Sequence, residues 1–394
     1  MGESARPRVA AVVTEYRPMS HADVIVGRLL EGYTLHGDRV EPRAEVASLY
    51  LDQVPANDIG RELAAKHGIP IFETIGEAMT LGGKGVAVDG VLLIGEHGNY
   101  PLNARGQILY PRRRFFDAAV AAMVAGGRIV PVFVDKHLSW SFDYARYMYD
   151  TAQRLGIPLL AGSSVPLAWR SPAGDWPLGA PLTEAVAVGY GPPEAYEFHT
   201  LEGLQSIVER RAGGETGVRA VHDLPRAEIW RAEKDGRWSG DLLMAALATL
   251  GLTGEQADQA LGALKHLILV EYRDGLRAAV CLFDAYVRDF AVAARGGDHS
   301  QAHRLALEPG RPFGHFSFLV RQIETLVLTG TPPYPAARTL LTTGILDVAM
   351  RSRTAGGVRI ETPELAIAYQ PADNIADTAI NVEPPFLQAA GSGR

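Results

Sequence analysis

A chain of 394 residues is too long for one ordinary domain, so two domains are expected. Its content of 47% hydrophobic and 21% charged residues is typical of a soluble globular protein, and its net charge of -7 argues against binding to nucleic acid or to a membrane surface. The single cysteine, Cys281, excludes an internal disulfide and a cysteine-based metal site. With no apparent signal peptide and no apolar run of about 18 residues, a cytoplasmic protein is expected.

The first half of the chain alternates apolar runs with helical patterns. This alternation predicts an α/β domain over residues 1–165, a Rossmann-like, doubly wound parallel sheet with right-handed crossovers. The predicted strands are 9–13, 45–51, 70–73, 86–94, 129–134 and the strand that begins at 159–161. The predicted helices are 22–33, 58–67, 75–79, 112–124 and 143–155, and glycines at 68, 126, 127 and 156 end the second, fourth and fifth of them.

The second half has a different pattern, with strands more widely spaced among helices. It predicts an α+β domain over 166–394, which serves substrate binding and oligomerisation and has an open, mostly antiparallel sheet with helices on one side. A hairpin turns at Asp274–Gly275, a good turn signal. Predicted strands are 185–188, 218–221, 267–272 and 276–283, and predicted helices are 199–211, 241–250, 316–328 and 336–350. The final AAGSGR is expected to be disordered.

Ionisable and hydroxyl side chains follow four of the predicted parallel strands. If the strand order is the usual 3-2-1-4-5-6, the carboxyl ends of strands 1, 4, 5 and 6 are neighbours, and ligands bind there in this class of sheet. The clearest case is the buried run 129–134, which ends abruptly in three ionisable residues. The side chains at the four strand ends are Glu15, Tyr16, Arg17, Ser20, His21, Glu96, His97, Asp135, Lys136, His137 and Ser163.

The turn after the first strand indicates how well a dinucleotide cofactor can bind. A dinucleotide site normally needs glycines there, so that backbone N–H groups can approach the pyrophosphate. Residues 14–23 contain no glycine, which argues against ordinary NAD(P) binding. A usable helix start remains, because Ser20 can cap it, and Asp52 at the end of the second strand can hold a ribose. Ser20, Asp52 and Ser163 are therefore the candidate cofactor-binding residues.

The remaining polar groups suit a divalent metal. Imidazole and carboxylate ligands are the mixture that Mn, Fe or Zn prefers, and such an ion polarises a carbonyl or activates a water. The predicted ligands are His21, Glu96, His97, Asp135 and His137. Lys136 and His97 are the predicted acid–base residues, with Tyr16 and His222 as further catalytic candidates. The alternative is that these side chains only bond loops together at the sheet edge.

Three features add detail without deciding the function. In an extended strand Asp135 and His137 point one way and Lys136 the other, so the three need not share one site. Arg112, Arg113 and Arg114 follow Pro111 at a helix start, where positive charge opposes the helix dipole, and they indicate either a solvated face or an anionic ligand. His315 is expected at the edge of the core, and it is also a candidate to line the crevice.

These segments together resemble a known family. VDGVLLIG, then AGGRIVPVFVDKHL, then LLAGSS, with PPYPAARTLLTTGILDVAMRS near the end, are similar to the Gfo/Idh/MocA oxidoreductases. Their Glu-Lys-Pro motif corresponds to Asp135-Lys136-His137, and Lys136 matches the lysine that this family uses near nicotinamide and substrate. The resemblance implies NAD(P)-linked oxidation of sugars, polyols or related metabolites, and a dimer or tetramer of identical chains. The glycine-rich loop is absent, and Glu96-His97 stands where the family has small residues and a proline.

Three functions follow from these observations. The main prediction is an enzyme that acts on a small polar metabolite (sugar-, polyol- or amino-acid-like) in a crevice between the domains, by metal-assisted lyase, isomerase or hydrolase chemistry without a dinucleotide. The alternative is an NAD(P)-dependent oxidoreductase with an atypical phosphate loop. The third possibility is a non-catalytic sensor or scaffold, which the density of ionisable groups at the strand ends disfavours.

Overall fold

The computed structural model describes residues 5–387, and the chain divides into two compact units. One unit comprises the chain up to Gly162 together with Pro312–Ala336, and the other comprises Ser163–Arg311 and the chain from Ala337 onward. The predicted disorder at the C-terminal AAGSGR lies outside the described residues. Among the described helices none has the length and apolar character needed to cross a membrane.

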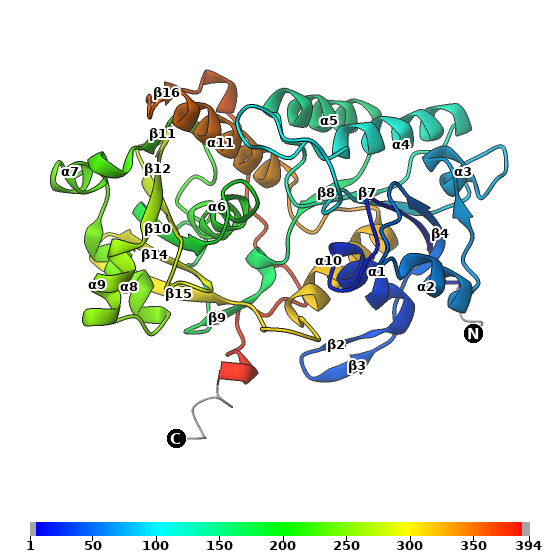
Figure 1. Cartoon of the computed structure of the whole chain (residues 1–394), viewed down its shortest axis with the longest axis horizontal. Helices are drawn as coiled ribbons and strands as arrows, with labels where there is room; N and C mark the ends of the chain where they lie inside the picture. Colours follow the sequence, from blue (N-terminus) through cyan, green and yellow to red (C-terminus); the bar gives the residue numbers. More distant parts are fainter. Residues whose placement is uncertain (1–4, 388–394) are drawn as a thin grey trace. The chain divides into compact units, whose positions relative to one another are not determined.

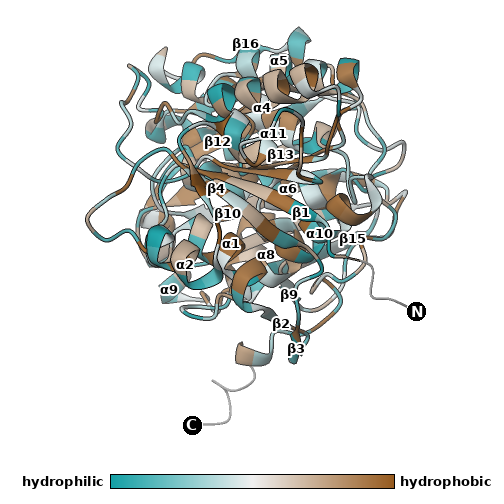
Figure 2. Ribbon diagram, turned by 90° about the vertical axis from the view of Figure 1, so that its right-hand side faces the viewer, coloured by the Kyte–Doolittle hydropathy of each residue, from teal (hydrophilic) through white to brown (hydrophobic). Residues whose placement is uncertain are grey.

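The first unit is built on a six-stranded sheet in which every pairing is parallel. The strand order β5-β4-β1-β6-β7-β8 is the predicted 3-2-1-4-5-6 arrangement, which is thereby confirmed. The central strands are apolar on both faces because helices cover both, and their brown residues stand out in Figure 2. The strands are β1 Arg8–Val13, β4 Glu45–Leu51, β5 Ile71–Phe72, β6 Gly90–Ile94, β7 Val132–Asp135 and β8 Leu159–Gly162.

The crossover helices of this unit begin and end close to their predicted positions. They are α1 His21–Glu31, α2 Gly60–His67, α3 Ile75–Thr80, α4 Arg112–Gly126 and α5 Phe142–Leu155. Gly68, Gly127 and Gly156 end α2, α4 and α5 in the left-handed conformation, which glycine adopts at little cost. A short hairpin after α1, formed by β2 (Tyr33–Leu35) and β3 (Asp38–Val40), was not predicted.

Helix α10 (His315–Thr329) belongs to the first unit, although its sequence position lies in the segment expected to form the second domain. Its buried apolar residues include Leu319, Val320 and Ile323, and the helix packs against α1. Arg28 of α1 ties the two together, because its guanidinium donates to the Phe313 carbonyl at 2.8 Å and to Ser317 Oγ at 3.2 Å. The start of α10 therefore lies beside α1.

The second unit contains an eight-stranded sheet in the order β16-β11-β12-β13-β10-β14-β15-β9. Its pairings are antiparallel except for β10 with β13, so the predicted open, mostly antiparallel sheet is confirmed. The predicted turn at Asp274–Gly275 joins β12 to β13, with Gly275 at φ 97°. The strands are β9 Trp169–Ser171, β10 Leu182–Tyr190, β11 Val218–Leu224, β12 Leu264–Tyr272, β13 Arg277–Phe283, β14 Phe290–Gly296, β15 His299–Ala306 and β16 Ile360–Glu361.

Helices cover both faces of this second sheet (Figure 1). On one face α6 packs so closely that a Cβ at Gly189 would lie 2.0 Å from Thr200 Oγ1. On the other face Val186, Val188 and their neighbours form a core with the helices between β11 and β12. The prediction of helices on one side only is therefore wrong, because an apolar sheet face needs a cover. The helices are α6 Ala195–Val208, α7 Ile229–Lys234, α8 Gly240–Thr249, α9 Glu255–Gly262 and α11 Ala337–Thr354, with 3-10 turns at Val165–Leu167, Arg226–Glu228 and Pro363–Leu365.

The helices that cover the second face of this sheet limit the ways in which identical chains can pair. The resemblance implied pairing of identical chains, and a sheet-to-sheet dimer needs a free apolar face. The side of the sheet that carries Val186 and Val188 is buried under α7, α8 and α9 of the same chain. A homo-oligomer stays a prediction, and it would have to use another surface.

Candidate active site

Three neighbouring strands of the parallel sheet bring polar side chains to one edge. Glu96 lies just beyond β6, Lys136 directly follows β7, and Thr14 follows β1. Lys136 Nζ lies 2.9 Å from Glu96 Oε1, and the Thr14 hydroxyl donates to the Glu96 carbonyl at 2.6 Å. Because the carboxyl ends of adjacent parallel strands meet, the predicted clustering of these strand ends holds for this set.

A buried arginine completes this group. Arg112, the first residue of α4, is fully buried, and its Nη2 lies 2.7 Å from Glu96 Oε2 while its Nη1 lies 3.0 Å from His137 Nε2. A Cβ at Gly95 would come within 2.6 Å of the arginine side chain, so this position needs glycine. Burial by itself would raise the pKa of Glu96, but the charges of Lys136 and Arg112 outweigh it and hold that pKa well below its usual range. Glu96 is therefore a charged anchor between two cations.

From the sequence, Arg112 stood out only as one of three arginines at a helix start and had no assigned role in the site. Three consecutive arginines at a helix start suggested a solvated face or an anionic ligand, and the structure gives each a different environment. Arg113 lies over the rings of Tyr144 and Tyr147, at 4.3 Å and 4.5 Å, and Arg114 pairs with Asp52. The usable signal was the conflict with the helix dipole, which a buried carboxylate next to the helix start resolves for Arg112.

A second group pairs a histidine with a carboxylate. His21, the first residue of α1, places its Nδ1 2.7 Å from Oδ2 of Asp135, which is completely buried at the end of β7. A carboxylate accepts hydrogen bonds, so the network assigns the proton to Nδ1 and leaves the lone pair on Nε2. The His21 ring also contacts the rings of His97 and Phe316, with centroids 5.3 Å and 5.2 Å away. This pair has the arrangement of an oriented general base.

Backbone strain marks the same three strand ends. Met19, His97 and Lys136 adopt φ values of 63°, 70° and 63°, in the left-handed region that side chains with a Cβ rarely occupy. Each such residue costs about 1–3 kcal/mol and persists where the surroundings require it, often at functional sites. The prediction that Lys136 points away from its neighbours is wrong for this reason. The left-handed turn breaks the strand alternation, so that Lys136 reaches Glu96 while His137 reaches Arg112.

The predicted metal centre is wrong. Among residues 5–387 no group of three or more His, Cys, Asp or Glu side chains is arranged to hold a metal ion. The physical reason is that the proposed carboxylate ligands already have partners: Glu96 binds Lys136 and Arg112, and Asp135 accepts a hydrogen bond from His21. His137 faces the guanidinium of Arg112 instead of a ligand position.

Three further predicted residues of this unit have structural contacts. Tyr16, a catalytic candidate, is fully buried, and its side chain crowds Gly60, where a Cβ would lie 2.8 Å from Tyr16 Cβ. Asp52 follows β4 and accepts from Tyr50 and Tyr100, each at 2.7 Å, besides its pair with Arg114. Ser20 caps α1 as predicted by accepting from the Asp23 N–H at 3.3 Å. The functional roles proposed for these residues stay predictions.

The last two predicted residues lie in the second unit. His222 on β11 has both ring nitrogens engaged, with the Gly357 carbonyl at 2.7 Å and Arg237 Nη2 at 2.8 Å. The Ser163 hydroxyl lies 2.5 Å from Glu202 Oε2 and 3.0 Å from His199 Nδ1. Sequence reasoning did not single out His199 or Glu202, because inside a long predicted helix neither carries a motif. Their spacing of three residues, which puts both on one helix face, was the available signal.

We expect Arg112→Met to lower the free energy of unfolding by about 3–5 kcal/mol, because the change leaves a buried carboxylate short of a partner. Arg113→Met, the adjacent change at a side chain that is 37% exposed, should cost about 1 kcal/mol or less. Urea unfolding followed by circular dichroism measures both. Equal losses for the two variants would show that the Glu96 pair adds no stability.

Acid should destabilise the first unit through two of its buried histidines. Burial lowers the pKa of His97 and of His315 from 6.5 to about 3. The unfolded chain therefore binds protons between about pH 6.5 and 3 that the folded chain does not, so stability is complete above pH 6.5 and falls as the pH drops through this window. Urea midpoints at pH 7 and 4.5 test this, and His315→Asn should flatten the slope more than His299→Asn, an exposed control. A midpoint that stays constant or rises with acid would contradict it.

Comparison with known proteins finds solved structures with a similar fold. No protein-family model matches the sequence, and no curated protein does. Among solved structures, GenD2 from gentamicin A biosynthesis in complex with NAD is 17% identical, with a TM-score of 0.57 over 92% of this chain and 97% of that one. Myo-inositol dehydrogenase from Lactobacillus casei in complex with NAD(H) and myo-inositol is 11% identical, with a TM-score of 0.57 over 91% and 97%. Scyllo-inositol dehydrogenase from the same organism is 9% identical, with a TM-score of 0.55 over 90% and 98%.

These neighbours, together with the site geometry, correct the main functional prediction. Metal-assisted lyase, isomerase or hydrolase chemistry is not supported, because the candidate ligands form internal ion pairs and the similar structures are of dehydrogenases, two of them in complex with NAD or NAD(H). The likeness extends over nine-tenths of the chain and both units. The chain thus has the fold of the Gfo/Idh/MocA-type dehydrogenases, and the resemblance seen in its sequence is confirmed at that level.

Proposed function

We propose that this chain is an NAD(P)-dependent oxidoreductase that acts at a hydroxyl-bearing carbon of a small polar metabolite such as a polyol or sugar. The observation that carries the proposal is the ordered set of Lys136, Glu96 and Arg112 beside the His21–Asp135 pair. This set lies at the carboxyl edge of a sheet whose strand order is that of dinucleotide-binding folds. The dehydrogenases that share the fold support the cofactor class.

The residues present fit a dinucleotide at three points. Helix α1 begins directly after the β1 turn, so its positive end lies at the sheet edge. Asp52 stands at the end of β4, the position that meets a ribose in this fold. Arg114 beside it has a side chain that is 55% exposed, and an arginine at this place suits the 2′-phosphate of NADP.

The phosphate turn itself is built differently from a glycine-rich loop. Met19 supplies the left-handed residue, and its N–H donates to Asp23 Oδ2 at 2.7 Å. A phosphate at this turn would compete with the Asp23 carboxylate for that N–H. We therefore expect binding that depends more on Arg114 and Asp52 than on the turn.

The catalytic assignment follows from the two groups at the strand ends. A bound nicotinamide ring supplies the acceptor for the hydride that leaves the substrate carbon. His21, oriented by Asp135, is suited to take the hydroxyl proton at Nε2. Lys136 is suited to donate a hydrogen bond to the substrate oxygen, and Glu96 holds its ammonium group in place. The buried Glu96–Arg112 pair keeps this arrangement rigid.

Nucleotide titration tests the proposal. Intrinsic fluorescence of the purified protein is followed against NADH and NADPH, and reduction of NAD+ and NADP+ is then assayed with a panel of polyols and sugars. We expect saturable binding of at least one nucleotide, weakened by Arg114→Met and unchanged by Arg113→Met. Absence of binding for both NADH and NADPH would overturn the oxidoreductase assignment.

A further inference from the structure

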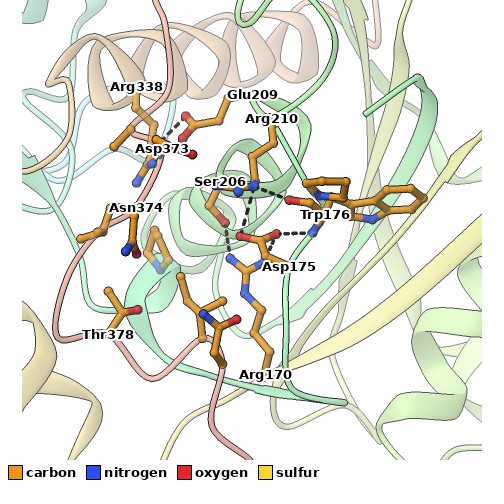
Figure 3. Close-up of a pocket in the computed structure, with 16 residues that line it drawn as sticks. Arg170, Asp175, Trp176, Ser206, Glu209, Arg210, Arg338, Asp373, Asn374 and Thr378 are labelled. Carbon is orange, nitrogen blue, oxygen red and sulfur yellow. Dashed lines mark hydrogen bonds and ion pairs between the residues drawn. The ribbon is translucent and has the colours of Figure 1, made fainter. Parts of the chain in front are cut away.

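A pocket of about 220 Å³ lies within the second unit, outside the site described above. Its walls come from β9, the last turns of α6, the start of α11 and the segment 372–381 (Figure 3). This volume lies below the roughly 300–1,000 Å³ of sites for drug-sized ligands, so it suits a small metabolite.

Three arginines reach into this pocket. Arg170 is 1% exposed; its Nη1 lies 2.6 Å from Asp175 Oδ1 and its Nη2 donates to Ser206 Oγ at 3.3 Å. Figure 3 shows Arg170 and Arg210 directed at Asp175, and Arg338 directed at Glu209. Arg210 Nε lies 3.6 Å from Asp175 Oδ2, and Arg338 Nε donates to Glu209 Oε2 at 2.9 Å.

The charges in the buried part of the pocket do not balance. Three guanidinium groups face two buried or mostly buried carboxylates, Asp175 and Glu209, while Asp373 at the rim is exposed. Glu209 also accepts from the Tyr369 hydroxyl at 2.8 Å, which uses more of its capacity. Apart from the exposed Asp373, the lining residues thus carry one more positive than negative charge, and a buried charge without a counter-charge is costly.

The hydrogen bonds of Arg170 point to the same shortage of negatively charged acceptors in the pocket wall. Its buried Nε has no hydrogen-bond partner among residues 5–387. Burial lowers the pKa of Arg170, and the like charges of Arg210 and Arg338 add to this effect although Asp175 opposes it. A buried N–H without a partner costs about 1–3 kcal/mol, so the fold keeps this group at a cost that a ligand would remove.

We propose that this pocket binds a small anion that carries a carboxylate or phosphate group. The oxyanion accepts from the arginines, and Asn374, Thr378 and Asn381 of the 372–381 segment are available for the polar remainder of the molecule. This assignment is independent of the proposed oxidoreductase activity, because the two sites share no residue.

The wall formed by the 372–381 segment is held in place without a ligand. The Gly174 N–H donates to the Ile380 carbonyl at 2.9 Å, and the Ala379 N–H donates to the Leu167 carbonyl at 3.1 Å. Ala379 is completely buried. A preformed site of this kind loses little freedom when a ligand enters, which favours affinity from few contacts.

Two probes test the proposal on the full chain: sodium phosphate and sodium malonate, each titrated at constant ionic strength set with NaCl. Trp176 lines the pocket and is buried, so tryptophan fluorescence reports on occupancy, and thermal unfolding gives an independent measure through ligand stabilisation. We expect a saturable response to at least one probe. Arg210→Met should weaken it about tenfold or more, since a charge-assisted hydrogen bond contributes on that scale.

Arg231→Met is the matched control, because its side chain on α7 is 83% exposed and lies outside the pocket; it should bind as the original chain does. Arg170→Met should abolish the response, and if that variant does not fold, Arg210→Met decides. Saturation by malonate identifies the carboxylate class and saturation by phosphate the phosphate class, and either supports the proposal. A response no greater than that to NaCl, or unchanged affinity in Arg210→Met, would overturn it.

Discussion

Lys136→Met should lower kcat by about 10²–10⁴-fold on the best substrate found in the nucleotide-linked assay. The lysine is almost completely buried and is held by Glu96 at 2.9 Å, so no other described side chain of the set can take its place beside the substrate oxygen. Methionine keeps the length and the apolar stem while removing the donor. The change should leave nucleotide affinity within about threefold of the original, which separates loss of chemistry from loss of binding.

Lys66→Met serves as the control for this experiment, because that lysine lies in the same unit with a side chain that is 59% exposed. It should retain full activity. Circular dichroism establishes that both variants are folded. If Lys136→Met turns over at the rate of the control, the lysine takes no part in catalysis and the assignment of this strand end is wrong.

Asp135→Asn is expected to have the second large effect, a loss of about 10²–10⁴-fold in kcat. The carboxylate accepts a hydrogen bond from the Nδ1–H of His21 at 2.7 Å. Asparagine can present an N–H donor instead, which favours the opposite tautomer of the ring. The base at Nε2 is then lost although the imidazole remains. Because the two residues act as a unit, His21→Asn alone and the double variant should lose about as much as Asp135→Asn.

The split between kcat and nucleotide binding distinguishes this role from a purely structural one. Loss of an oriented base should lower kcat and leave nucleotide affinity within about threefold of the original, whereas a structural change would weaken both. Asp38→Asn, at an exposed position on β3, is the control and should leave both unchanged. Additive losses in the double variant would show that His21 and Asp135 act separately.

Local sequence patterns were sufficient to predict the strands and helices of the parallel-sheet unit. A short apolar run buried on both faces, followed by a helix that a glycine ends, is a signal contained in adjacent residues. The ends of β1, β6 and β7 accordingly carry the polar side chains expected there, and β4 has the limits that its alternating pattern predicted. The strand order then followed from the usual topology of such folds.

The identity of the site depended on contacts that sequence spacing does not contain. Glu96 and Arg112 are sixteen residues apart, and His21 and Asp135 are 114 apart, so their pairing needed the folded sheet. The same polar residues were consistent with metal ligands until the structure showed that the two carboxylates already have partners, Glu96 in Lys136 and Arg112 and Asp135 in His21. The strained φ of Lys136, which turns its side chain to Glu96, is likewise a property of the packed chain.

In both units, contacts between parts of the chain that are far apart in sequence decided where helices pack. Helix α10 carries a clear apolar face, but only the packing against α1 and the bonds from Arg28 show which unit buries that face. In the second unit the helices between β11 and β12 cover a sheet face that an amphipathic pattern alone leaves unassigned. Periodicity and turn chemistry, which depend on neighbouring residues, therefore established the elements, their order and the edge where ligands bind. Burial and charge pairing between residues far apart in the chain decided what each ionisable group does there.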